Sequence, residues 1–194
     1  MRVSADIAFK EWAIVVDALG RGEQILILRK GGLREQRGEF HVDHRAFWLF
    51  STQFHEAERS VIASKRPALR ELAANAPRDA VDIQFYAVAD PVVPLADASL
   101  LSRLQGRHIW AEQVLQQRFD FGRGAGLHAL IVRVHQLPWP ERLPLRENYG
   151  GCKSWVQLEH PVAGEVTPVV DDAEFARQRD AILELVSDHA CLNS

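Results

Sequence analysis

The sequence has little cysteine and no long apolar stretch. Its 194 residues contain two cysteines, Cys152 and Cys191, too few for a disulfide framework. No apolar run approaches the roughly 20 residues that cross a bilayer, so a membrane-spanning segment is not expected. The first residues, 1–6, lack the apolar core of a secretory signal peptide. Together these absences predict a cytoplasmic protein.

The residues that are present are those of a globular chain with unevenly placed charge. Hydrophobic residues make up 47% and charged residues 25% of the chain, whose net charge is −3. Residues 98–158 carry eight Lys or Arg against four Asp or Glu, whereas residues 159–194 carry two against eight. A basic region beside an acidic one permits an anionic ligand on one face, although such runs are also common on solvated surfaces.

Apolar periodicity predicts an α+β fold, a mixed sheet flanked by helices in one domain over residues 1–194. A division into 1–92 and 93–194, the second part ending in an acidic helix, is the alternative. The first half reads helix 6–19, strands 24–29, 39–42 and 46–51, helix 54–75 and strand 81–89. The second half adds helices 97–104 and 109–118, strands 127–137 and 154–160, and helix 172–189, with residues 138–140 expected to end the strand before them.

Two motifs combine a glycine pair with cations at a strand end. They are Leu28-Arg29-Lys30-Gly31-Gly32-Leu33 and Tyr149-Gly150-Gly151-Cys152-Lys153-Ser154-Trp155. Tandem glycines let the backbone approach a ligand, and their N–H groups beside Arg or Lys form an anion seat. The predicted phosphate contacts are therefore Arg29, Lys30, Gly31, Gly32, Gly150, Gly151 and Lys153. No nucleotide P-loop pattern is present, and the alternative is that both glycine pairs are simple turns.

A second group of residues suggests metal-dependent hydrolysis. Helix, three strands, helix, strand is the core order of restriction-endonuclease-like nucleases, which cut phosphodiesters with metals held by acids. Asp43 follows the second of these strands, and Gln53 and His55 stand where such nucleases place an acid or amide and a lysine. Asp43, Gln53 and His55 are thus candidate catalytic residues, and Asp43, His44 and His55 candidate ligands for Mg²⁺ or Mn²⁺. Because histidine replaces the lysine, the pattern favours a divergent or degenerate nuclease, and a polar turn is the alternative.

Aromatic and cationic residues in the second half suggest a binding module. Trp110, Tyr149 and Trp155 are candidates for stacking on bases, with Arg118 and Arg133 contacting phosphates. The alternatives are that the tryptophans anchor the core and that Arg118 pairs with Glu112 on its own helix.

Several short motifs occur together in an order that resembles a known family. They are Phe9-Lys10-Glu11-Trp12, Leu28–Gly32, Phe47-Trp48-Leu49-Phe50 with Thr52 and His55, His108-Ile109-Trp110, Arg118-Phe119 and Tyr149–Trp155. This set resembles the prokaryotic family called domain of unknown function 1802 over about residues 8–160. Ser51 departs from the family, which usually has proline there. The resemblance implies a cytosolic, single-unit protein with no assigned reaction.

The function predicted from these features is recognition of nucleic-acid phosphates or metal-dependent phosphodiester hydrolysis. A non-catalytic module of the PUA-like kind, binding nucleic acid or a phosphorylated small molecule, is one alternative, and an adaptor or structural protein is another. Cys152 is either a nucleophile activated by Lys153 or a buried thiol. The C-terminal helix over 172–189 covers the core or forms a homodimer.

Overall fold

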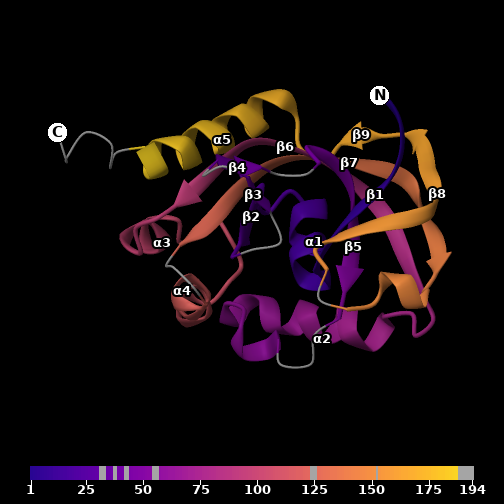
Figure 1. Cartoon of the computed structure of the whole chain (residues 1–194), viewed down its shortest axis with the longest axis horizontal. Helices are drawn as coiled ribbons and strands as arrows, with labels where there is room; N and C mark the ends of the chain where they lie inside the picture. Colours follow the sequence, from indigo (N-terminus) through magenta and orange to yellow (C-terminus); the bar gives the residue numbers. More distant parts are fainter. Residues whose placement is uncertain are drawn as a thin grey trace.

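A strongly curved, mixed sheet of seven strands forms the centre of the molecule (Figure 1). The computed structural model describes residues 1–30, 34–36, 39–41, 44–53, 57–122, 126–151 and 153–187. The strands of the sheet are β1 (Arg2–Trp12), β2 (Leu26–Arg29), β5 (Ala46–Thr52), β6 (Ala80–Leu95), β7 (Leu127–Pro144), β8 (Trp155–Glu165) and β9 (Thr167–Pro168). Their order is β2-β7-β6-β5-β1-β8, with β9 also on β7, and β3 (Arg34–Gln36) pairs with β4 (Glu39–His41) in a separate hairpin.

Helices cover one face of this sheet. They are α1 (Ala13–Gly20), α2 (Arg66–Asn75), α3 (Ser99–Arg103), α4 (Glu112–Asp120) and α5 (Asp172–Ser187), with 3-10 turns at Ala57–Arg59, Ala63–Lys65 and Glu147–Tyr149. In Figure 1, α1 lies in the middle of the molecule, α2 runs below it, α3 and α4 lie to the left, and α5 lies along the top. This mixture of a sheet with helices on one face confirms the predicted α+β class.

Alternate residues of the strands enter two separate hydrophobic cores. Phe9 and Phe47 face the helices, whereas Ala8 and Trp48 face the inside of the curve. This alternation is the period of two that buries both faces of a strand. The inner core joins strands that are far apart in the sheet order: a Cβ on Gly164 of β8 would lie 2.6 Å from the side chain of Leu137 on β7. The sheet is therefore curled toward a barrel.

The predicted helix over residues 6–19 is wrong in its first half. Residues 2–12 form β1, and the helix begins only at Ala13. The apolar residues Phe9, Trp12 and Val16 fit a helical spacing, but β1 has partners on both sides, parallel to β5 and antiparallel to β8. These long-range pairings override the local pattern. The first half of the chain consequently begins strand, helix, strand, which departs from the endonuclease-like order.

The strand over 127–137 does not end at the prolines. β7 continues to Pro144, passing Pro138 and Pro140 where its register with β6 shifts, so that neither proline has to donate a ladder hydrogen bond. Helix 54–75 is shorter than predicted, because its helical part begins at Arg66 after two 3-10 turns. The possible domain boundary at 92/93 falls inside β6, whose two ends both pair with β7.

The C-terminal helix packs on its own chain. Ile182 is buried, and Phe175, Leu183 and Val186 pack against the core beneath the helix. A homodimer formed through α5 would therefore have to use its outer face. Within the described ranges, no helix has the length and apolar character that crossing a membrane requires.

Candidate functional site

The candidate site forms where strand ends from both halves of the chain meet. β1 and β5 run parallel and finish together, with Trp12 opposite Thr52. β8 begins at the same edge, and the Lys10 N–H donates a hydrogen bond of 2.8 Å to the Ser154 carbonyl. β2 is four strands away from β1 in the sheet order, yet the curvature brings its last residue, Arg29, to this edge.

Arg29 fastens the end of β2 to β1 and β8. Its Nη2 donates to the Lys10 carbonyl at 3.2 Å and to Ser154 Oγ at 3.1 Å. The guanidinium also lies 4.7 Å above the Phe9 ring. Its Nε is buried and has no hydrogen-bond partner among the residues that the structure describes. The two glycine motifs of the sequence are thus brought together, and Arg29 serves first as a structural link between them.

A buried carboxylate, Glu11, lies beside this link. Glu11 is 2% exposed, and its Oε1 accepts a hydrogen bond of 2.8 Å from the N–H of Trp12. Its Oε2 lies 3.8 Å from Nη1 of Arg29. A buried carboxylate requires compensating charge, which Arg29 supplies.

Arg118 projects from α4 into the same region, where it stacks on two tryptophans. Its guanidinium lies 3.8 Å above the Trp110 ring and 5.0 Å above that of Trp12. Within the described part of the chain it makes no hydrogen bond or ion pair, so the expected pairing with Glu112 does not form. Burial lowers the pKa of Arg118, the Glu11 carboxylate opposes this, and the Arg29 guanidinium adds to it. The group still carries its charge at neutral pH, because an arginine pKa starts far above it.

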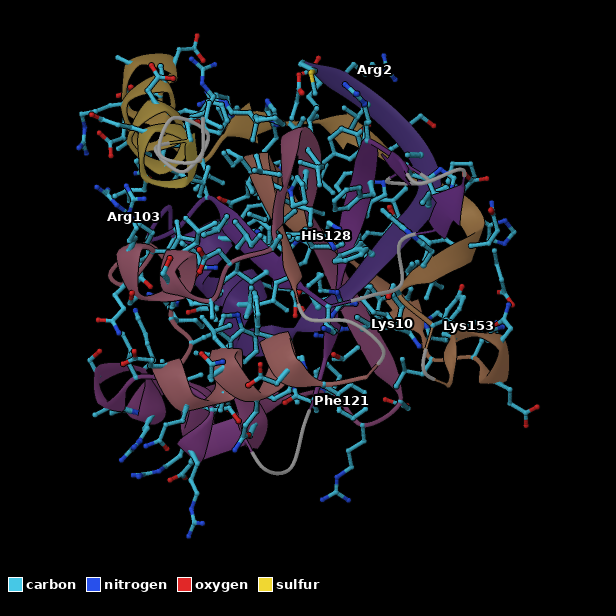
Figure 2. All side chains as sticks on the ribbon, turned by 60° about the vertical axis from the view of Figure 1, so that its left-hand side comes forward. Arg2, Lys10, Arg103, Phe121, His128 and Lys153 are labelled. Atoms are coloured by element: carbon cyan, nitrogen blue, oxygen red, sulfur yellow. The ribbon has the colours of Figure 1, made fainter. Side chains whose placement is uncertain are left out.

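Three lysines extend this positive region. Lys10 Nζ donates to the Gly151 carbonyl at 3.1 Å, and Lys30 Nζ donates to the Phe119 carbonyl at 2.6 Å. Lys153 is exposed and makes no hydrogen bond or ion pair with any residue that the structure describes. We call Lys10, Arg29, Lys30, Arg118 and Lys153 the basic cluster. Figure 2 shows Lys10 and Lys153 near each other, beside the strand ends.

Arg133, by contrast, lies apart from the basic cluster. Its guanidinium donates to Asp172 Oδ1 at 2.6 Å and to the Asp171 carbonyl at 3.0 Å, and it lies 4.8 Å above the Phe175 ring. This arginine has a carboxylate partner and holds the start of α5 to β7, so its contact with a phosphate stays a prediction.

The aromatic residues predicted to stack on bases are largely occupied by the protein itself. Trp110 is 2% and Tyr149 5% exposed, and the Tyr149 hydroxyl accepts a hydrogen bond from the Glu159 N–H. Trp155 is half-buried, with its ring against Phe9, Phe47 and His44. In this structure Trp110 and Tyr149 therefore pack within the protein, and Trp155 has contacts on several sides. Stacking of these rings on bases stays a prediction.

The second glycine pair is only partly available to an anion. The Gly150 N–H donates to the Glu147 carbonyl, and the Gly151 carbonyl accepts from Lys10. Gly151 has a φ of +77°, a left-handed conformation that favours glycine. The first pair, Gly31 and Gly32, lies outside the described residues.

The proposed metal and catalytic residues are mostly outside the described ranges. Asp43 and His55 lie there, as does Cys152. Gln53 is exposed at the end of β5, and the His44 ring lies 5.1 Å from that of Trp155. Among the residues that are described, no group of three or more His, Cys, Asp or Glu side chains could hold a metal ion. Catalysis with Mg²⁺ or Mn²⁺ thus stays a prediction.

Sequence reasoning missed two features of the site. Glu11 and Trp12 are central to it, but the helix predicted over residues 6–19 did not bring them to the strand ends beside Arg29 and Arg118. Phe121, which follows α4, is 75% exposed close to the Phe119 carbonyl that holds Lys30. An exposed aromatic residue directly after a helix that carries an arginine was the signal available for Phe121.

Comparison with known proteins identifies the family. A family model described as domain of unknown function (DUF1802) matches residues 8–181. The chain belongs to this family. A comparison with curated proteins finds no match.

The chain is also similar to solved structures of ASCH from Zymomonas mobilis. The first is 13% identical with a TM-score of 0.45, and the alignment covers 90% of this chain and 93% of that one. A serine-to-alanine variant is 12% identical and a tyrosine-to-phenylalanine variant 14%, each with a TM-score of 0.44 and 90% of this chain covered, with 94% and 96% of those chains covered.

Proposed function

We propose that this DUF1802 protein binds single-stranded nucleic acid without cleaving it, with backbone phosphates held by the basic cluster. The observation that carries the proposal is Arg118, a half-buried guanidinium 3.8 Å above the Trp110 ring that has no acceptor among the described residues. A cation held in place by stacking, with its donors unused, is ready to accept a phosphate without further ordering.

The charge around Arg118 supports the same conclusion. Five cations come from four segments, and among the described residues the carboxylate that lies beside the two guanidiniums is the buried Glu11. A surplus of positive charge on this scale attracts a polyanion and makes its binding sensitive to salt.

An exposed aromatic side chain favours a single strand over a duplex. Phe121 is 75% exposed at the end of α4, three residues after Arg118. Bases of a single strand can stack on such a ring, whereas bases inside a duplex cannot reach it.

The test is fluorescence anisotropy with labelled single- and double-stranded RNA and DNA across a salt series. We expect the single strands to bind most tightly, with log K falling linearly against log salt concentration. Arg118→Ala should weaken binding by roughly 1.5–3 kcal/mol, the contribution of hydrogen bonds to a charged group. Phe121→Ala should cost about 1–3 kcal/mol if a base stacks on it.

The matched control is Arg2→Ala, which removes an exposed arginine at the opposite end of β1, about 30 Å away at the usual rise of a strand. Figure 2 places Arg2 at the top of the view, away from Lys10 and Lys153. Absence of salt-sensitive binding to any of the four nucleic acids would overturn the proposal.

The same reactions, repeated with Mg²⁺ or Mn²⁺ and resolved on a gel, test the hydrolytic hypothesis. Metal-dependent cleavage that disappears in Asp43→Ala would make the protein a nuclease and replace the non-catalytic proposal.

A further inference from the structure

A cavity of about 700 Å³ opens on the other side of the β1 and β5 ends. Its walls come from α1, the end of β5, α2, the start of β6 and the segment after β7. Figure 1 shows α2 running below α1 and β5, so that it forms the lower wall. This volume is within the range of sites that hold small organic ligands.

The walls are mainly apolar. Val16, Phe50 and Val81 are almost completely buried, and Leu72 and Phe85 are partly buried behind the open space. Such a surface suits a flat, weakly polar ring, because the ring removes apolar area from water as it enters.

The carboxylates in the lining are already neutralised. Asp17 pairs with Arg21 at 2.9 Å, and Asp82 pairs with Arg142 at 2.7 Å. The hydrogen bond from Arg142 lowers the pKa of Asp82, so this pair stays charged on both sides. The two acids therefore contribute little repulsion toward an anion.

Two arginines in the lining have hydrogen-bond donors that can bind an anion. Arg78 is exposed and has no hydrogen-bond or ion-pair partner among the residues that the structure describes. Nε of Arg146 lies 3.3 Å from a carboxylate oxygen of Glu159, and the guanidinium makes no hydrogen bond with a residue in the described ranges, so it has donors to offer. One end of the cavity is thus suited to an anionic group.

Three side-chain amides complete the lining. Gln53 and Asn75 are exposed at its border and make no hydrogen bond with another described residue. The side-chain N–H of Gln84 donates a hydrogen bond of 3.4 Å to the Leu137 carbonyl. Its amide oxygen accepts no hydrogen bond from a residue that the structure describes. Amides offer a donor and an acceptor side by side, the pattern that pairs with the edge of a nucleobase.

We propose that this cavity binds a nucleoside monophosphate, with the base between the apolar walls, its edge on the amides and its phosphate on Arg78 and Arg146. The site is separate from the proposed strand-binding surface: only Lys10 borders both, and none of the other cluster residues lines the cavity.

The experiment is isothermal titration calorimetry of the whole chain with adenosine, guanosine, cytidine and uridine 5′-monophosphates, with the matching nucleosides and with inorganic phosphate. We expect at least one monophosphate to bind saturably, its nucleoside to bind more weakly, and phosphate alone to bind least. Arg78→Ala should reduce affinity for the monophosphate roughly tenfold and leave affinity for the nucleoside unchanged.

Ala76→Trp places a large ring at the mouth of the cavity and should abolish both kinds of binding. Arg2→Ala should change neither, and circular dichroism confirms that each variant is folded. The proposal is overturned if no monophosphate binds, if phosphate competes as well as the nucleotide does, or if binding survives in both Arg78→Ala and Ala76→Trp.

The oligonucleotide titrations are run on the same preparation. Binding of monophosphates without binding of oligonucleotides would reject the proposed function and keep this inference. Binding of oligonucleotides alone would do the reverse.

Discussion

Two arginines lie over aromatic rings, one in segment 108–118 and one at the junction of β7 with α5. They differ in whether a carboxylate neutralises the guanidinium. At the junction, Arg133 lies over Phe175 and is paired with Asp172. In the segment, Arg118 lies 3.8 Å above Trp110 and has no acceptor among the described residues. The stacking is similar in the two places, whereas among the described residues only Arg133 has a carboxylate partner.

The first residue of segment 108–118 is a buried histidine that also lacks a partner among the described residues. His108 is 6% exposed, and neither of its ring nitrogens makes a hydrogen bond of good geometry with a residue that the structure describes. Stacking of an arginine on a ring is thus a way of positioning it, and does not reveal its role. The role follows from whether a carboxylate contacts the guanidinium directly, as Asp172 contacts Arg133 and as no residue in the described ranges contacts Arg118.

The largest expected effect comes from His108. Burial lowers its pKa to about 4 from 6.5, so between these values the unfolded chain binds more protons than the folded one. The free energy of unfolding should therefore fall as pH drops from about 6.5 to about 4, by up to about 3 kcal/mol from this residue. His108→Leu should remove that part of the pH dependence and cost little at neutral pH, since the nitrogens have no partners to lose.

Urea unfolding at a series of pH values measures this. The control is His160→Leu at an exposed position, which should leave the change of the unfolding free energy with pH as it is in the wild type. The lowered pKa of His135 acts in the same direction in every variant, so the difference from wild type isolates His108. Equal pH dependence in wild type and His108→Leu would show that the imidazole is not a buried neutral group.

The second prediction is a crossover between the two arginines. Arg133→Ala removes an ion pair whose aspartate is fully exposed, so it should lower the free energy of unfolding by about 1 kcal/mol and leave nucleic-acid affinity unchanged. Arg118→Ala should do the opposite, with a large loss of affinity and a small loss of stability. Chemical denaturation and anisotropy on both variants decide it, and a loss of affinity in Arg133→Ala as large as that in Arg118→Ala would remove the distinction.

Local patterns were sufficient for the elements whose neighbours agree with them. The alternation in residues 81–89 and the apolar run of residues 25–28 became strands in the structure, at β6 and β2. Residues 6–12 have a spacing that fits a helix and an extended strand nearly equally, and only the pairing of β1 with β5 and β8 decides between them. Such pairings join residues about 40 and 150 positions apart, which no local window contains.

The candidate site was predictable in its cations and not in its surroundings. Arg29 and Lys153 were recognisable from glycine-rich strand ends, and curvature of the sheet brings their segments together through Ser154. Whether Arg118 or Arg133 lacks a carboxylate depends on where α4 and α5 pack, so the sequence could not separate them. The burial of Trp110 and Tyr149 is likewise a property of the packed core and not of their neighbours in the chain.

The smallest expected effect on oligonucleotide affinity is at Lys153. It tests whether this exposed member of the basic cluster takes part in binding. This side chain is exposed and has no partner in the described ranges, so its charge acts through solvent and pays the entropy of ordering a long chain. Lys153→Ala should weaken oligonucleotide binding by about 0.5–1 kcal/mol and reduce the magnitude of the salt slope by roughly 0.7, the share of one single-strand phosphate. The comparison with Arg2→Ala removes the general effect of net charge, because both variants lose one cation. If Lys153→Ala and Arg2→Ala have the same affinity and the same salt slope, Lys153 does not contact a phosphate. The bound strand would then contact Arg118 and Lys30 but not the second glycine motif.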